Sequence, residues 1–210
     1  MSGLIVSLAI LAVIVGGAAY VYFGRKKATA AALAVPPFSK YLITYSQGLP
    51  SEMPKDTNGK FYFDFPQGGG WAGYFATTST PIKVGSTITL KFTLSGTGKL
   101  IPMKESGSGS PAVHLLLWRQ NDNMALETYR YWSSGGVELT KTGQFTLSQI
   151  VDPAKWTDVY GKPGTDNPAD FTALLNNLAY LGFTFGAEFF GHGVYAAGNV
   201  RFTLDSLTVT

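Results

Sequence analysis

The start of the chain holds the feature that most restricts how it can fold. Residues 4–23 form an apolar run without a single charge. At about 1.5 Å per residue, a helix of this length spans roughly 30 Å, which is the thickness of a bilayer's hydrocarbon core. Three cations, Arg25, Lys26 and Lys27, follow closely. We therefore predict a single transmembrane helix, with a lipid bilayer as its partner and the cations as its stop.

The positions of the charges predict how this segment is used. A secretory signal peptide carries its basic residues before the apolar core, so the uncleaved anchor is the better interpretation and the signal peptide is the alternative. Positive charges beside a span favour the cytoplasm, which predicts a short N-terminus outside and the body on the cytoplasmic side. The residues assigned to the membrane segment are Leu4, Ile5, Ile10, Leu11, Ile14, Tyr20, Phe23, Arg25, Lys26 and Lys27.

The anchor ends before a separate domain begins. Residues 28–35 are rich in alanine and extend the helix until Pro36 and Pro37 end it. We therefore divide the chain into an anchor, residues 1–35, and a body, residues 36–210. Ala12 and Gly16 lie four residues apart, a spacing that would support a homo-oligomer, although so alanine-rich and glycine-rich a run produces it by chance.

The charge balance of the body excludes several classes of function. The chain has 16 Lys and Arg against 13 Asp and Glu, and the excess of three is Arg25, Lys26 and Lys27, so residues 28–210 sum to zero. A nucleic-acid-binding body would need a clustered basic face, so we expect no nucleic-acid partner. The absence of cysteine excludes disulfides, thiol catalysis and cysteine-ligated metal.

Short alternating segments predict an all-β body. Residues 86–95 place Ile88, Leu90, Phe92 and Leu94 on one side, and residues 112–118 form a continuous apolar run that is typical of a central strand. One helix is expected over residues 167–178, with Asn167 or Asp170 as its cap, and a short helical turn is expected after Asp152. We predict an antiparallel β-sandwich of jelly-roll type with one short helix. The other expected strands cover residues 38–45, 61–65, 71–78, 127–132, 144–151, 180–185 and 200–209, the last with a bulge near Asp205.

No pattern of catalytic residues accompanies this fold. His114 lies in an apolar strand and His192 lies between two glycines, and neither belongs to a metal-binding spacing. Asp122, Asp152, Asp158 and Asp166 lie in loops, where a structural calcium site is the alternative to ordinary turn chemistry. We therefore expect no enzyme, no cofactor and no metal.

Aromatic residues are the best candidates for binding. Aromatic rings flanked by polar groups stack on sugar rings, and the same rings anchor protein interfaces. Core packing is the other interpretation of each ring. Residues 129–132 alternate between two faces of a strand, so at least one aromatic ring there is expected to point outward. The candidate binding residues are Trp71, Tyr129, Arg130, Tyr131 and Trp132.

Several segments of the body carry a family resemblance. They are YRYWSSGGVEL, GQFTL, DPAKWTDVYGK, YLGFTFGAEFFGHGV and RFTLDSLTV, within residues 71–210. This pattern resembles uncharacterised bacterial and phage β-sandwich domains that are similar to carbohydrate-binding-module jelly rolls. The resemblance implies a non-catalytic sandwich and brings no established ligand or site residue. The N-terminal anchor is not part of the pattern.

Two functions fit these observations. The first is a non-enzymatic membrane-anchored structural protein, a virion membrane-associated or minor capsid component of a phage with an internal membrane, whose sandwich packs against other proteins of the assembly. The second is an envelope-tethered carbohydrate-binding or adhesion module, with a glycan as its partner. A membrane-bound hydrolase has only generic support.

Overall fold

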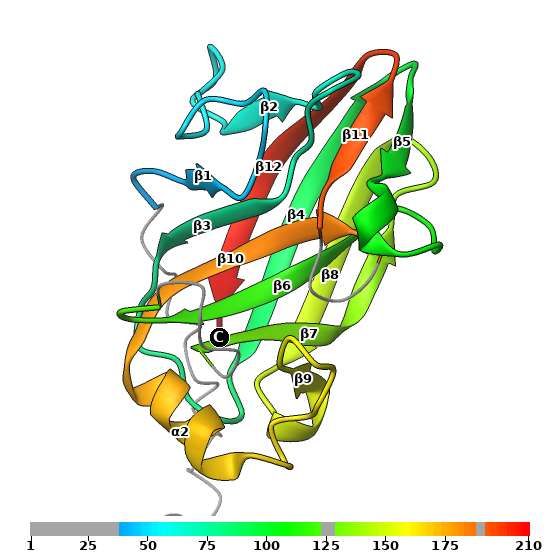
Figure 1. The fold of residues 1–210 in the computed structure, drawn as a ribbon. Helices are drawn as coiled ribbons and strands as arrows, with labels where there is room; N and C mark the ends of the chain where they lie inside the picture. Colours follow the sequence, from blue (N-terminus) through cyan, green and yellow to red (C-terminus); the bar gives the residue numbers. More distant parts are fainter. Residues whose placement is uncertain (1–37, 123–128, 188–191) are drawn as a thin grey trace, which may run out of the picture. The chain divides into compact units, whose positions relative to one another are not determined.

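A computed structural model describes residues 38–122, 129–187 and 192–210 of the chain (Figure 1). The predicted transmembrane helix over residues 4–23, with Arg25, Lys26 and Lys27, lies outside these residues. Within the described part of the chain, none of the helices is both long enough and apolar enough to cross a membrane.

The larger sheet of the body has six antiparallel strands in the order β1-β3-β10-β6-β7-β9. Its central strand β6 is apolar on both faces, as the continuous run in the sequence predicts. The short helix α2, Pro168–Asn176, immediately precedes β10. The strands are β1 (Leu42–Thr44), β3 (Tyr74–Thr78), β6 (Ala112–Arg119), β7 (Arg130–Glu138), β9 (Trp156–Thr157) and β10 (Leu178–Gly186).

The second sheet has four antiparallel strands in the order β2-β12-β4-β8. They are β2 (Tyr62–Asp64), β12 (Val200–Val209), β4 (Thr87–Gly96) and β8 (Gly143–Ile150). A two-stranded ribbon pairs β11 (Val194–Ala197) with β5 (Lys99–Pro102). Both larger sheets place strands from distant parts of the chain side by side, and the body is the predicted all-β sandwich with one helix. Two 3-10 helices, Lys104–Ser106 and Pro153–Lys155, complete the described elements.

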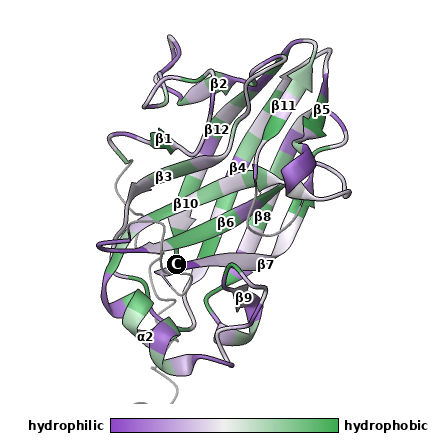
Figure 2. Ribbon diagram, in the orientation of Figure 1, coloured by the Kyte–Doolittle hydropathy of each residue, from purple (hydrophilic) through white to green (hydrophobic). Residues whose placement is uncertain are grey.

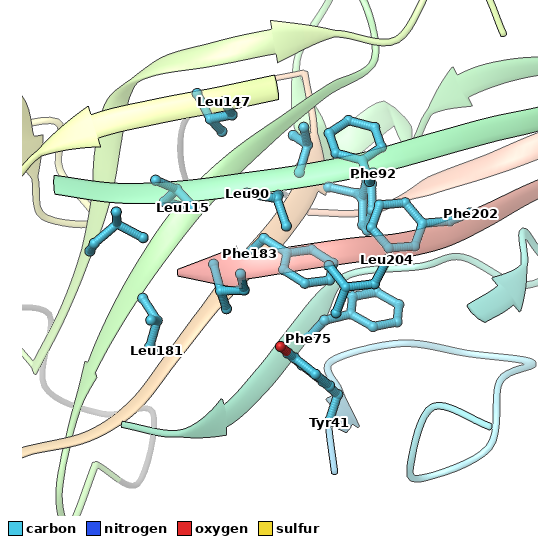
Figure 3. Close-up of a cluster of buried hydrophobic side chains, with 14 of the residues drawn as sticks. Tyr41, Phe75, Leu90, Phe92, Leu115, Leu147, Leu181, Phe183, Phe202 and Leu204 are labelled. Atoms are coloured by element: carbon cyan, nitrogen blue, oxygen red, sulfur yellow. The ribbon is translucent and has the colours of Figure 1, made fainter. Parts of the chain in front are cut away.

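The core lies between the two larger sheets and is mostly aromatic at its centre (Figure 3). Phe75 and Phe183 stack with ring centroids 5.4 Å apart, and Phe202 stacks on Phe183 at 5.3 Å across the sandwich. Hydrophobic residues alternate with hydrophilic ones along β4 (Figure 2), so only one face of that strand enters the core. This alternation fixes the register of the four-stranded sheet.

The outward faces of the two sheets differ in character. On the six-stranded sheet, Tyr74, Leu116 and Trp132 form a second buried cluster. On the four-stranded sheet, hydroxyl side chains dominate: Thr89 pairs with Ser148 and Thr208 in the strand register, and the Thr89 and Ser148 hydroxyl oxygens lie 2.9 Å apart. We call this outward face of β2, β12, β4 and β8 the hydroxyl face.

Several predicted local features are confirmed. Asp152 caps the turn that follows it, because its Oδ1 accepts a hydrogen bond of 2.9 Å from the Ala154 amide. The β12 pairing shifts register between Leu204 and Ser206, which is the expected bulge at Asp205. Asn167 occupies the N-cap position of α2 without a side-chain capping bond, so the expected side-chain cap is wrong there.

Other predicted boundaries were wrong. The first strand was expected over residues 38–45, but β1 covers only Leu42–Thr44 and Tyr45 follows with a positive φ of 48°. A strand was expected to end at Trp132, whereas β7 covers Arg130–Glu138. The strand needs a glycine at position 136, because a Cβ there would lie 2.4 Å from Cε1 of the His114 ring. Part of the predicted 127–132 strand lies outside the described residues.

Candidate functional site

The ribbon of β11 and β5 presents one aromatic ring at the surface. Val194 and Ala196 are buried, and Tyr195 between them points to the opposite side, where it is half-buried. Tyr195 pairs with Ile101 across the ribbon, and Met103 follows β5. The Met103 amide donates a 2.9 Å hydrogen bond to the Gly193 carbonyl, which extends the pairing by one residue at the end of the ribbon where β5 stops and β11 begins.

Trp71 is held beside this ribbon by its backbone and its indole. Its amide donates to the Gln47 carbonyl and its carbonyl accepts from the Gln47 amide, both at 2.9 Å. The indole Nε1 donates to the Tyr45 carbonyl oxygen at 3.3 Å. A Cβ on Gly193 would lie 2.4 Å from Trp71 Cδ1, so the indole packs directly on the backbone of a glycine with φ +112°. The ring is therefore fixed in position while staying half-exposed.

Trp71, Tyr195 and Met103 line an open pocket of about 330 Å³, which we call the aromatic pocket. Its remaining wall is a loop of three glycines, Gly68, Gly69 and Gly70. Gly68 and Gly69 adopt positive φ, and a Cβ on either would meet nothing within 4 Å. The pocket thus combines aromatic and thioether surface with bare backbone, which can donate and accept hydrogen bonds.

The remaining predicted binding residues do not join Trp71. Tyr131 and Trp132 are fully buried, so the expectation that they form an exposed binding surface is wrong. Tyr131 enters the main core against Phe171, with ring centroids 5.1 Å apart. Trp132 packs against Tyr74 on the outer face of the six-stranded sheet, which is itself covered.

Arg130 and Tyr129 also have structural contacts. Arg130 is buried and forms an ion pair with Asp122, with 2.8 Å between Nε and Oδ2. Tyr129 is half-buried, and the Arg119 guanidinium lies over its ring at 4.3 Å. Neither residue lines the aromatic pocket. The four residues 129–132 thus stabilise the sheet, and Trp71 is the predicted binding residue that the structure places in a pocket.

The loop aspartates have ordinary structural roles. Asp122 pairs with Arg130, and Asp152 caps its turn. The buried Asp158 accepts backbone hydrogen bonds from Tyr160 and Lys162 at 2.9 and 3.0 Å. Among the described residues, no group of three His, Cys, Asp or Glu side chains is placed to hold a metal ion.

The two histidines occupy different environments. His114 is buried on β6, with its Nδ1 3.0 Å from the Ser133 carbonyl oxygen. His192 lies near Tyr45, with ring centroids 6.1 Å apart. Burial lowers the pKa of His192, and the nearby Glu105 charge opposes that shift.

Tyr195 and Met103 had no usable signal in the sequence. Tyr195 lies on the ribbon and Met103 directly after it, and the two strands are too short and too rich in small residues to show a clear period. Tyr195 was one aromatic residue among many. The bridge between Ala72 and Val194 brings it to Trp71, through two backbone hydrogen bonds of 2.8 and 2.9 Å.

The chain matches no protein-family model and no curated protein sequence. One solved structure similar to it comes from work on endo-acting O-glycanases that prominent members of the human gut microbiota express to initiate mucin breakdown. The TM-score is 0.44 at 10% identity, over 84% of this chain and 94% of that chain. A second, from work on CBM4 structure and function, has a TM-score of 0.28 at 11% identity, over 75% of this chain and 94% of that chain. Likenesses this distant say nothing about what the chain binds; the β-sandwich itself is established by the strand pairing described above.

Proposed function

We propose that the body of this chain is a non-enzymatic carbohydrate-binding module that holds a neutral sugar ring in the aromatic pocket. The observation that carries this proposal is the fixed, half-exposed indole of Trp71 beside Tyr195 and Met103. One face of a sugar ring presents C–H groups that pack on aromatic rings. The hydroxyls at its rim need donors and acceptors, which the bare backbone of Gly68 and Gly69 can supply.

The charge of the site favours a neutral ligand. The lining of the aromatic pocket contains neither a carboxylate nor a cationic side chain. Residues 28–210 also have no net charge, so long-range attraction for an anionic or cationic ligand is weak. The same lining has no carboxylate pair or imidazole for acid–base work on a bound sugar, which supports binding without catalysis.

Glycan binding by the full chain in lipid nanodiscs tests this proposal. We expect the wild-type chain to bind at least one neutral glycan on a broad array, and Trp71→Ala to lose binding at least tenfold because one stacking surface is removed. Tyr160→Ala is the matched control, because Tyr160 is a strongly exposed aromatic residue, at 67%, and lies outside the pocket. An array on which the wild-type chain binds nothing would contradict the proposal.

A second candidate is a structural component of an assembly, such as a virion membrane-associated or minor capsid protein. The hydroxyl face favours it, because the Thr and Ser side chains at its centre, such as Thr89, Ser148 and Thr208, can pack against another protein and satisfy their hydrogen bonds there. The basic residues after the predicted span also favour a body between the host's inner membrane and a capsid shell. In this candidate, Thr89→Arg would prevent incorporation into purified particles, whereas Trp71→Ala would not.

A further inference from the structure

We propose that a second, polar pocket beside the aromatic pocket is a further subsite for the same glycan, so that the module binds an oligosaccharide rather than a single sugar. This inference rests on the proposed function of the aromatic pocket. The polar pocket has a volume of about 500 Å³ and is lined by Asp64, Phe65, Gln67, Ser95, Gly96, Asn199, Val200 and Arg201.

Two hydrogen-bonded side-chain pairs organise the polar pocket before any ligand arrives. Arg201 donates from Nε and Nη2 to the two carboxylate oxygens of Asp64, at 2.7 and 2.8 Å. Its guanidinium also lies 4.3 Å from the centre of the Tyr62 ring. Gln67 donates from Nε2 to Asn199 Oδ1 at 2.9 Å. Each side chain is therefore held in place by a partner, which lowers the entropy lost when a ligand binds.

The chemistry of these pairs fits vicinal hydroxyls. A sugar hydroxyl donates one hydrogen bond and accepts others, so a diol needs donors and acceptors placed close together. The ion pair between Arg201 and Asp64 provides both. The side-chain amides of Gln67 and Asn199 and the Ser95 hydroxyl provide them as well. Asp64 and Arg201 neutralise each other, so neither a simple anion nor a simple cation gains a net attraction here. A neutral polyhydroxylated chain is the ligand class that remains.

The same two segments of the chain line both pockets. In the first, Asp64 and Gln67 line the polar pocket, and the next residues, Gly68 to Trp71, line the aromatic one. In the second, Tyr195 lines the aromatic pocket while Asn199 and Arg201 line the polar one.

A hydrogen bond of 2.8 Å from the Ala196 amide to the Pro66 carbonyl joins the two segments. The ends of β2, β11 and β12 therefore meet at the end of the sandwich away from α2 (Figure 1). A glycan seated on Trp71 would need only to pass the glycine loop to reach Arg201.

Binding of sugars of increasing length tests this inference. The full chain in nanodiscs would be titrated with mono-, di- and tetrasaccharides of the cello-, laminari- and chito- series. We expect at least one series whose tetrasaccharide binds about tenfold more tightly than its monosaccharide. Asn199→Ala and Arg201→Ala should each remove most of that tenfold gain, because each removes one polar pair. Neither should change monosaccharide affinity.

The control is Lys60→Ala, which breaks another exposed ion pair, Lys60 with Asp205 at 2.6 Å, on the same sheet but outside the polar pocket. Monosaccharide affinity that stays unchanged in each variant shows that the fold is intact.

Equal affinities for short and long sugars in every series that binds would overturn this inference while leaving the aromatic pocket as a binding site. A length-dependent gain that both polar variants retain would overturn it as well. Loss of all sugar binding by the wild-type chain would instead overturn the proposed function, and this inference with it.

Discussion

Trp132 and Trp71 show how the same side chain can serve the core in one place and the surface in another. Trp132 is fully buried against Tyr74, with Arg130 near its ring, whereas Trp71 is half-exposed. We expect Trp132→Ala to lower the free energy of unfolding by about 3–5 kcal/mol, because it leaves a large cavity. Urea denaturation monitored by circular dichroism measures this change. Tyr160→Ala should stay within about 0.5 kcal/mol of the wild type as a surface change.

Asp64 offers a prediction at a single carboxyl group. Hydrogen bonds from Arg201 hold the pKa of Asp64 below its ordinary value, with the Arg201 charge adding to them and partial burial opposing them. The stabilisation from this pair is therefore present above the ordinary pKa and is lost as pH falls through the lowered one. Because the Asp64 side chain is 62% exposed, solvent screening keeps its contribution to stability small.

The pKa itself is the better quantity to measure. We expect Arg201→Ala to raise the pKa of Asp64 toward its ordinary value in a carboxyl-carbon NMR titration. Lys60→Ala, in the separate pair with Asp205, should leave the Asp64 titration unchanged. If the titration midpoint of Asp64 were the same with and without Arg201, the hydrogen-bonded pair of Arg201 and Asp64 would not persist in solution.

At the level of elements, the ribbon of β11 and β5 positions the aromatic pocket through Gly193. Alanine at this position would place a Cβ 2.4 Å from Trp71 and would hold a non-glycine residue at φ +112°. We expect Gly193→Ala to cost about 1–3 kcal/mol of stability from the backbone conformation. It should also reduce sugar affinity at least tenfold, because the indole must move.

The matched control for this change is Gly85→Ala. Gly85 has a similar φ of +91°, but a Cβ there meets nothing within 4 Å and the residue lines neither pocket. It should therefore lose stability without losing affinity. If Gly85→Ala and Gly193→Ala reduced sugar affinity equally, the contact between Gly193 and Trp71 would not be what positions the ring.

The predicted strands are long enough to show a burial pattern in the sequence, whereas the missed strands are short. The long alternation of β4 and the apolar run of β6 were predicted because burial on one face or on both leaves a readable pattern. The ribbon of β5 and β11 was missed because each strand has only four residues and includes Pro102 or small residues. Its existence depends on partners far away in the chain, and no local window contains that information.

The candidate site was therefore only partly predictable. Trp71 was identified from its chemistry, but its neighbours Tyr195 and Met103 come from the missed ribbon. Residues 129–132 were expected to place at least one aromatic ring at the surface, because alternation should leave one face of β7 exposed. The outer face of the six-stranded sheet instead carries its own apolar cluster, so both faces of that strand are covered. A single strand's pattern cannot reveal whether its second face is covered.

At the scale of the whole molecule, the predicted membrane anchor leads to a prediction about the side of the membrane on which the body lies. Arg25, Lys26 and Lys27 predict the cytoplasmic side. We therefore expect a reporter enzyme fused after Thr210 to show cytoplasmic activity and no periplasmic activity in a bacterial host. Replacing the three cations with glutamine should weaken this preference. Periplasmic activity of the wild-type fusion would count against the assembly candidate and would favour an outward-facing glycan module.

The glycine loop also has a consequence for how this module could change over time. Gly68 and Gly69 border the aromatic pocket in open space, and the stacked phenylalanines of the core lie in other segments of the chain. Loop insertions are tolerated more readily than core changes, since lengthening a surface loop adds little closure entropy. Homologues could thus acquire new ligand preferences by insertions beside Gly68 and Gly69, whereas Gly70 must stay glycine because a Cβ there would lie 2.6 Å from the Gln47 carbonyl oxygen. Selection could therefore change ligand recognition at the glycine loop with little effect on the folding of the sandwich.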